Sequence, residues 1–179
     1  MASDKNILEI KIYYEDTDSG GVVYYANYLK YMERGRTEYL ADRGISVKGL
    51  MDQGTIFMVS RAEIDYKASA HYGETIILET TVAETTGATL LFRHRISEKL
   101  SNRLLVEGTI RMVCTDLSGK PKRTPREMAE RIPTGKERVQ VRIVPTIKSH
   151  RLFKNRSHIL LRTDRLSFHE MVFPVKRSL

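Results

Sequence analysis

The sequence of 179 residues contains a single cysteine, Cys114, and lacks any long hydrophobic run. One thiol excludes an intramolecular disulfide and leaves too few thiols for a zinc site. A membrane-spanning helix needs roughly 20 apolar residues, and no stretch of the chain approaches that length. The polar start of the chain also lacks the hydrophobic segment of a signal peptide. We therefore expect a cytoplasmic protein that carries no metal ion and no cofactor.

Histidine is scarce as well, because only His71 and His94 lie within residues 1–135. Two histidines leave little material for a Ser-His-Asp triad, and no set of Cys and His residues has the spacing of metal ligands. His94 lies on the apolar side of an alternating stretch, which favours a buried core residue over a catalytic base. His71 precedes Tyr72 and Gly73 in a turn, so we expect it at the surface.

Most of the chain carries no net charge. Residues 1–135 hold 19 basic and 19 acidic residues, whereas residues 136–179 hold 11 basic and 3 acidic ones. The net charge of +8 therefore comes entirely from the tail, and the body shows no electrostatic sign of a nucleic-acid-binding surface. We predict a folded domain over 1–135 and a basic C-terminal extension over 136–179.

The charge bias of this extension favours a solvated and poorly ordered state. Two patterns within it favour structure instead. Val139, Val141 and Ile143 alternate as in a strand, and residues 157–166 fit a short basic amphipathic helix. Contact with a membrane through this tail is an alternative role that the sequence leaves open.

Hydrophobic periodicity predicts one long helix among several strands. Residues 8–14 alternate as in a half-buried strand, with Leu8, Ile10, Ile12 and Tyr14 on one face. Residues 27–43 carry apolar side chains at helical spacing, and Gly44 is a suitable end for that helix. A loop is expected near residues 51–54.

Four more alternating stretches follow that loop without a helix between them, at about residues 62–68, 74–83, 90–96 and 106–114. A short helix is predicted at 125–131, with Thr124 as its N-cap. This order predicts an α+β fold in which an antiparallel sheet packs against one helix. It does not predict a doubly wound parallel sheet.

The loop before the long helix carries the residues most suited to chemistry. Asp18 is followed by Gly20 and Gly21, an apolar run and the predicted helix start. The first N–H groups of a helix are unpaired and lie at positive potential, and each well-aimed donor stabilises an oxyanion by roughly 3–4 kcal/mol. A nearby carboxylate could attack a carbonyl carbon or activate water. A purely structural turn has the same spacing, so spacing alone leaves both interpretations open.

Residues 13–40 contain the motif Thr17-Asp18-x-x-Gly21-Val22-Val23, then Asn27-Tyr28-Leu29 and Glu33-Arg34-Gly35-Arg36-Thr37-Glu38. These segments resemble the 4-hydroxybenzoyl-CoA thioesterase family, and within it most closely the subgroup linked to the Tol-Pal cell-envelope system. The order of strands agrees with that family over about residues 6–132.

The resemblance implies a hotdog fold, in which the sheet wraps around the long helix, and a homodimer or homotetramer that binds acyl-CoA between subunits. It also implies that Asp18, rather than its neighbour Asp16, is the catalytic carboxylate. The backbone N–H of Tyr25 is the implied oxyanion donor. Many members of the Tol-Pal subgroup carry His where this chain has Tyr25, and this departure removes a side-chain acid or base but keeps the main-chain donor.

Three further residues are candidates for substrate binding. Tyr14 could supply aromatic lining, together with Tyr24 or Tyr28. Glu33 is expected near the acyl group by resemblance, although a surface glutamate paired with a neighbouring cation is the simpler interpretation. Ser60 aligns with a strand that lines the family's site, or it is a strand-end hydroxyl without a role.

The resulting hypothesis is an acyl-CoA thioesterase that hydrolyses its substrate with Asp18 as nucleophile or general base. A hotdog hydratase or dehydratase is a second hypothesis, but such enzymes use a histidine that the motif here lacks. A third is a non-catalytic acyl-CoA-binding protein that docks on the cell-envelope machinery. The sequence does not identify the acyl group.

Overall fold

The computed structural model describes residues 4–132. The strand predicted around Val141, the helix predicted at 157–166 and the role of the basic extension lie outside the described residues. Within residues 4–132, no helix has both the length and the apolar character needed to cross a membrane.

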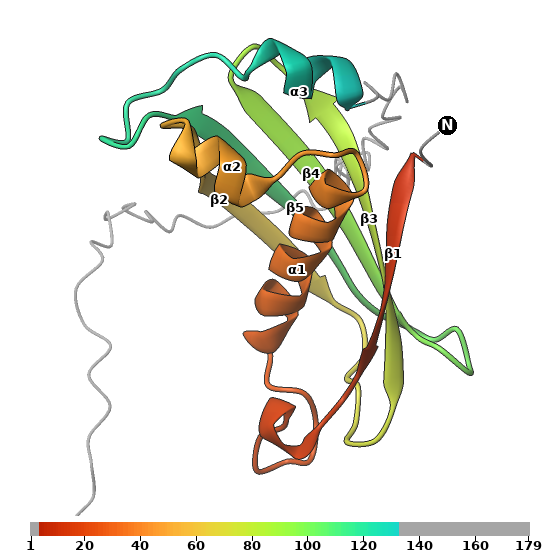
Figure 1. Cartoon of the computed structure of the whole chain (residues 1–179). Helices are drawn as coiled ribbons and strands as arrows, with labels where there is room; N and C mark the ends of the chain where they lie inside the picture. Colours follow the sequence, from red (N-terminus) through yellow and green to blue (C-terminus); the bar gives the residue numbers. More distant parts are fainter. Residues whose placement is uncertain (1–3, 133–179) are drawn as a thin grey trace, which may run out of the picture. The chain divides into compact units, whose positions relative to one another are not determined.

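Five strands form one antiparallel sheet with the order β1-β3-β4-β5-β2 (Figure 1). The strands are β1 (Lys5–Lys11), β2 (Ile56–Tyr66), β3 (Thr75–Thr85), β4 (Thr89–Glu98) and β5 (Leu104–Thr115). Strands β2 to β5 follow one another in the chain without an intervening helix. The predicted α+β class with an antiparallel sheet is therefore confirmed.

One long helix, α1 (Asn27–Ala41), packs against one face of this sheet (Figure 1). Its apolar side chains recur at helical spacing, and Tyr28, Tyr31 and Met32 are at most 2% exposed. Gly44 follows the helix with a φ of +68°, a conformation that glycine adopts without strain. The helix predicted over residues 27–43 is confirmed to within two residues.

Two glycines allow α1 to lie very close to the sheet. A Cβ atom added at Gly35 of α1 would collide with the side chains of Thr80 and Leu78 on β3. A Cβ atom added at Gly108 of β5 would lie only 2.8 Å from the Cε atom of Met32. Because protein interiors are close-packed, neither position accepts a side chain without a shift of its neighbours.

The core beneath α1 includes a histidine, His94, which is fully buried on β4. Its Nδ1 atom lies 3.1 Å from the hydroxyl of Thr80. Burial, with the nearby charge of Arg36 as a smaller cause, lowers the pKa of His94 to about 3. His94 is therefore neutral at ordinary pH, and its prediction as a core residue is confirmed. His71 lies at the surface as expected.

The strand predicted over residues 8–14 is wrong at its C-terminal end. Strand β1 stops at Lys11, and Tyr14 begins a short 3-10 helix, η1 (Tyr14–Asp16). The Asp16 carboxylate accepts the N–H of Tyr13 at 2.9 Å, and this local bond competes with continuation of the strand.

Two short helices also differ from expectation. Helix α2 (Val47–Asp52) occupies part of the segment predicted as a loop near 51–54. Helix α3 (Arg126–Arg131) confirms the predicted short helix, but Pro125 rather than Thr124 is its N-cap residue. Proline lacks an N–H group, which this position does not need.

Candidate active site

The loop before α1 folds around Asp18. The main-chain N–H of Asp18 donates to the Val22 carbonyl at 2.9 Å, and the N–H of Gly21 donates to the Asp18 carbonyl at 3.0 Å. The N–H of Gly20 donates to Oδ1 of Asp18 at 2.8 Å, which is a turn typical of aspartate. Gly21 has a φ of +73°, which a residue with a side chain rarely adopts. The loop therefore orients a carboxylate that remains exposed to solvent.

The neighbouring carboxylate, Asp16, holds the loop rather than facing a hollow. The main-chain carbonyl of Asp16 accepts the Tyr24 N–H at 2.9 Å and the side-chain amide N–H of Asn27 at 2.9 Å. Asn27 is the first residue of α1 and is buried, so this contact joins the loop directly to the helix. The main chain of Asp16 thus joins the loop to α1, and of these two carboxylates only that of Asp18 lines the hollow described below.

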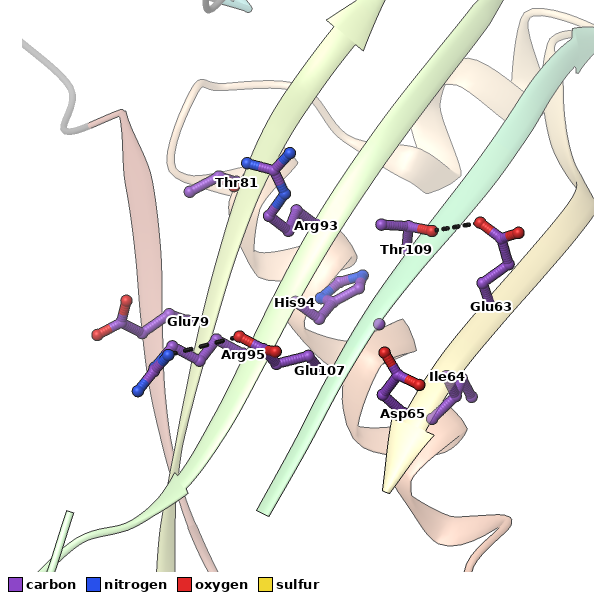
Figure 2. A pocket seen from close by; sticks show the side chains of 11 residues that line it. Glu63, Ile64, Asp65, Glu79, Thr81, Arg93, His94, Arg95, Glu107 and Thr109 are labelled. Carbon is purple, nitrogen blue, oxygen red and sulfur yellow. Dashed lines mark hydrogen bonds and ion pairs between the residues drawn. The ribbon is translucent and has the colours of Figure 1, made fainter. Parts of the chain in front are cut away.

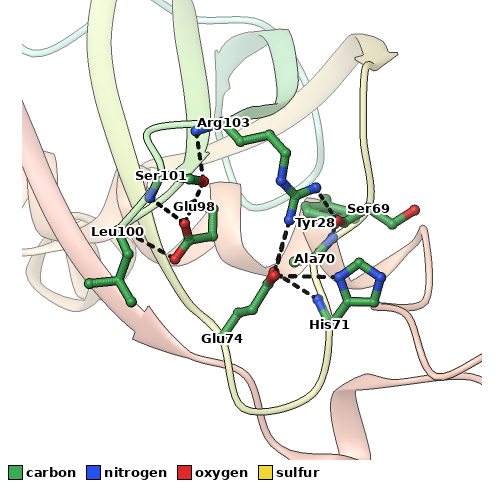
Figure 3. Close-up of polar contacts among 9 residues, drawn as sticks. All are labelled: Tyr28, Ser69, Ala70, His71, Glu74, Glu98, Leu100, Ser101 and Arg103. Atoms are coloured by element: carbon green, nitrogen blue, oxygen red, sulfur yellow. Dashed lines mark hydrogen bonds and ion pairs between the residues drawn. The ribbon is translucent and has the colours of Figure 1, made fainter.

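The segment between β2 and β3 supports the loop from the other side (Figure 3). The N–H of Val23 donates to the Ala70 carbonyl at 2.8 Å, and the N–H of Ala70 donates to the hydroxyl of Tyr28 at 3.0 Å. Arg103 donates to the Ser69 carbonyl at 2.7 Å. Because Tyr28 belongs to α1, these bonds fix the loop, the helix and residues 68–71 as one unit.

A second group of hydrogen bonds holds the turn between β4 and β5 that precedes Arg103 (Figure 3). The Glu98 carboxylate accepts the N–H of Leu100 at 2.9 Å and both the hydroxyl and the N–H of Ser101 at 2.6 Å. These donors lower the pKa of Glu98 to about 2. Glu98 is therefore ionised in the physiological range, and it organises a turn rather than transferring protons.

Helix α1 begins without a capping side chain. Ala26 is its N-cap residue, and the first turn contains no acidic residue. Among residues 4–132, no hydrogen bond uses the main-chain N–H of Tyr25 or Ala26 as a donor. Free N–H groups and the helix dipole both favour a negative charge at such a position. The start of α1 is thus suited to hold an oxyanion.

Asp18 and Tyr25 line the same hollow, which has a volume of about 340 Å³. It lies between the loop, the start of α1 and the residues that follow β2. Its lining consists of Asp18, Val22, Val23, Tyr25, Tyr28, Tyr66, Lys67, Ala68 and Ser69. The carboxylate and the helix-start donor that the sequence singled out therefore meet at one site.

Three tyrosine rings form the aromatic part of this hollow. The ring centroid of Tyr66 lies 6.4 Å from that of Tyr25 and 5.9 Å from that of Tyr28, with the rings edge to face. Burial raises the pKa of Tyr28 and of Tyr66 above the ordinary value. Both hydroxyls therefore remain protonated, and neither acts as a base near neutral pH.

The other three candidate residues lie outside this hollow within one chain. Tyr14 is 82% exposed, and its ring centroid lies 6.3 Å from that of Tyr72. Glu33 is exposed on α1 and accepts the Thr37 hydroxyl at 3.0 Å. Ser60 on β2 donates its hydroxyl to the Arg111 carbonyl at 3.2 Å. Their roles in substrate binding stay predictions.

A larger hollow of about 930 Å³ lies on the face of the sheet away from α1 (Figure 2). Several of its charged side chains already have partners: Arg95 lies 3.5 Å from Glu107, and Glu63 accepts the Thr109 hydroxyl at 3.3 Å. No predicted site residue lines it. Charged groups that already have partners are poorly placed to stabilise the charge that develops in a reaction. The larger size of this hollow therefore does not make it the active site.

Sequence reasoning missed Tyr66, Lys67 and Ser69 as lining residues. They lie 48 to 51 positions after Asp18 in the chain, and the pairing of β2 with β5 brings them to the start of α1. The alternation of apolar and polar residues predicted only that Tyr66 lies on a strand. No local motif in this stretch signals a site.

An antiparallel sheet around one central helix, with an oriented carboxylate beside the free start of that helix, defines a hotdog-fold protein suited to acyl-transfer chemistry. Comparison with known proteins agrees with this class. The profile of the thioesterase-like superfamily matches residues 13–132. The chain belongs to this superfamily.

Individual relatives extend the comparison. The acyl-CoA thioesterase YbgC of Haemophilus influenzae is 39% identical over 121 residues, which cover 66% of this chain and 88% of that protein. The crystal structure of a 1,4-dihydroxy-2-naphthoyl-CoA thioesterase from Synechocystis has a TM-score of 0.68 at 25% identity, covering 72% of this chain and 95% of that chain. A 4-hydroxybenzoyl-CoA thioesterase structure, only 16% identical, shares the fold with a TM-score of 0.67 over 73% of this chain and 100% of that chain.

Proposed function

We propose that this protein is an acyl-CoA thioesterase that hydrolyses a CoA thioester to a free acid and CoA. One observation carries the proposal: Asp18 and Tyr25 line a common hollow at the uncapped start of α1. The relatives named above act on acyl-CoA thioesters, and the chain covers most of the length of each. The fold, the site and the relatives therefore support the same reaction.

In the proposed reaction, the thioester oxygen accepts the Tyr25 N–H, which stabilises the negative charge that develops on it. Asp18 then acts in one of two ways. As a nucleophile, its oxygen attacks the carbonyl carbon, the C–S bond breaks, CoA leaves as a thiolate, and water hydrolyses the mixed anhydride. As a general base, it takes a proton from a water molecule that attacks the same carbon; the C–S bond then breaks, and CoA leaves as a thiolate that takes up the proton.

The hydratase hypothesis receives no support from the site. No histidine is among the residues that line the hollow, and His94 is buried with its pKa lowered to about 3. A non-catalytic acyl-CoA-binding role would leave the oriented carboxylate of Asp18 without a purpose. The thioesterase reaction uses both features of the site.

We further propose that the active form is a homodimer or homotetramer in the cytoplasm. Strand β2 is an edge strand of the sheet, and Met58 and Val59 on it are 50% and 52% exposed. Exposed apolar edges of this kind favour pairing with another copy. A free and buried Cys114 fits a reducing compartment.

Replacing Asp18 with Asn tests the proposed function. Asp18→Asn keeps the shape of the side chain and removes its charge, so we expect the release of CoA thiol to fall at least about a thousandfold while CoA-ester binding survives. A panel of short, long and aromatic acyl-CoAs supplies the substrates. Asp52→Asn, at the exposed end of α2, is the matched control and should retain full activity. Turnover close to wild type in Asp18→Asn would contradict the role of this carboxylate.

A further inference from the structure

The hydroxyl of Tyr66 makes a contact that the reaction described above does not use. Tyr66 is the last residue of β2, and its Oη atom donates to the main-chain carbonyl of Tyr25 at 3.2 Å. The two residues are 41 positions apart in the sequence. Within residues 4–132, this is the hydrogen bond that links the end of β2 directly to the residue carrying the oxyanion donor.

The helix itself does not satisfy the Tyr25 carbonyl. In a regular α-helix this oxygen would accept the N–H of Leu29, four residues later. Here the N–H of Leu29 donates to the Ala26 carbonyl at 3.2 Å. The Tyr66 hydroxyl therefore fills the place of the missing main-chain donor at the first turn.

The peptide group on the other side of Tyr25 is held independently. The Tyr24 carbonyl, which shares a peptide plane with the Tyr25 N–H, accepts the N–H of Asn27 at 2.9 Å. The Tyr25 side chain is 61% exposed, so packing of that ring does little to fix the residue. Two hydrogen bonds, one to each flanking carbonyl, determine the orientation of its backbone.

The ring of Tyr66 is about half exposed but rests against a buried ring of α1. It packs edge to face on Tyr28, which is 2% exposed and whose hydroxyl is occupied by the N–H of Ala70. Such aromatic pairs contribute beyond their buried area. The Tyr66 hydroxyl is thus held in place by the same unit that supports Asp18.

We propose that Tyr66 is a positioning residue for the thioester reaction: its hydroxyl fixes the Tyr25 carbonyl and, together with the bond that Asn27 makes to the Tyr24 carbonyl, restrains the Tyr25 backbone from both sides, so that the Tyr25 N–H stays aligned with the developing oxyanion. This inference rests on the proposed function. Tyr66 acts through Tyr25, and the proposal assigns it no proton transfer. Loss of its hydroxyl should reduce stabilisation of the transition state more than it reduces binding of the substrate.

Tyr66→Phe tests this inference with benzoyl-CoA as the substrate and free-thiol release as the readout. We expect kcat to fall about tenfold, which corresponds to about 1.4 kcal/mol, while KM rises by only about threefold and Tm stays close to wild type. Tyr72→Phe is the matched control, because within the described residues the Tyr72 hydroxyl makes no hydrogen bond and its ring is exposed. That variant should match the wild type in all three quantities.

Two inert analogues separate positioning from a merely structural effect. Phenacyl-CoA keeps a carbonyl that accepts a hydrogen bond, whereas phenethyl-CoA has none. Tyr66→Phe should weaken binding of phenacyl-CoA at least about threefold and leave phenethyl-CoA unchanged. Equal loss for both analogues, or an unchanged kcat, would overturn the role of Tyr66 alone. A wild-type protein that hydrolyses no acyl-CoA in the panel would instead overturn the proposed function, and this inference with it.

Discussion

Helices α1 and α2 are held in place in opposite ways. Helix α1 has no side-chain cap at its start but packs eight buried residues against the rest of the domain. Helix α2 contains no buried residue, and the Ser46 hydroxyl caps it by accepting the N–H of Gly49 at 3.0 Å. An ion pair between Lys48 and Asp52, at 3.1 Å, adds local support. One helix is stabilised by burial, the other by its own ends.

This difference explains how α1 can leave N–H groups available to a ligand. A short surface helix needs its cap, because propensity alone rarely stabilises six residues in water. A helix fixed by its apolar face does not depend on its first turn. Burial along α1 therefore compensates for donors that remain unpaired at Tyr25 and Ala26.

Of the changes that compare the two helices, the addition of a negative charge at the start of α1 is expected to have the largest effect. Ala26→Asp places a carboxylate beside the N–H groups of the first turn, where the helix dipole stabilises it by about 0.5 kcal/mol. The same charge repels the oxyanion of the thioester, so kcat should fall about a hundredfold. Thiol-release kinetics and denaturant unfolding, measured on one preparation, check the two opposite changes.

The equivalent change at α2 is the control for that experiment. Val47→Asp puts a carboxylate on the first residue of α2, which is exposed and lines no part of the hollow around Asp18. Its activity should equal that of the wild type. Equal losses in both variants would mean that net charge, rather than the start of α1, controls turnover.

A smaller effect, on stability, is expected from glycine substitutions in the two helices. Gly35→Ala drives a methyl group into Thr80 and Leu78 and should lower the free energy of unfolding by about 2 kcal/mol. Gly49→Ala in α2 meets only the exposed Ser46, 3.3 Å away, and should change stability by less than about 0.5 kcal/mol. Urea unfolding of both variants measures the difference. Similar costs would show that α1 is not the more tightly packed helix.

The smallest effect is expected from removing the cap of α2. Ser46→Ala deprives the N–H of Gly49 of its acceptor and should cost about 1 kcal/mol. The loss should appear as faster amide hydrogen exchange within α2, with activity unchanged. A fall in turnover after loss of the α2 cap would link α2 to the site.

Local features of the molecule could be predicted from the sequence, and long-range ones could not. Asp18, Gly21 and Tyr25 lie within eight consecutive residues, so their meeting requires only one loop and one helix start. The long helix and the four later strands follow from hydrophobic period alone. Tyr66 contacts Tyr25 only because β2 pairs with β5 and ends beside α1, and no local pattern records that pairing.

The errors of prediction have equally local causes. Tyr14 fits the alternation of a strand. The chain leaves the strand before Tyr14, however, because the Asp16 carboxylate accepts the main-chain N–H of Tyr13. Helix α2 buries no residue, so its sequence has no amphipathic pattern from which a helix could be predicted. Ser46, a residue type that favours the N-cap position, was the one local signal of its start. Tyr14, Glu33 and Ser60 remain predictions as substrate-binding residues, because within one chain none of them lines the hollow around Asp18.

The missing side chain of Gly108 has a kinetic consequence. Because Met32 occupies the space where that side chain would stand, α1 cannot slide or roll over β5 without steric conflict. The donors at its start are consequently preorganised before any ligand arrives, and no reorganisation energy is spent on aligning them as charge develops.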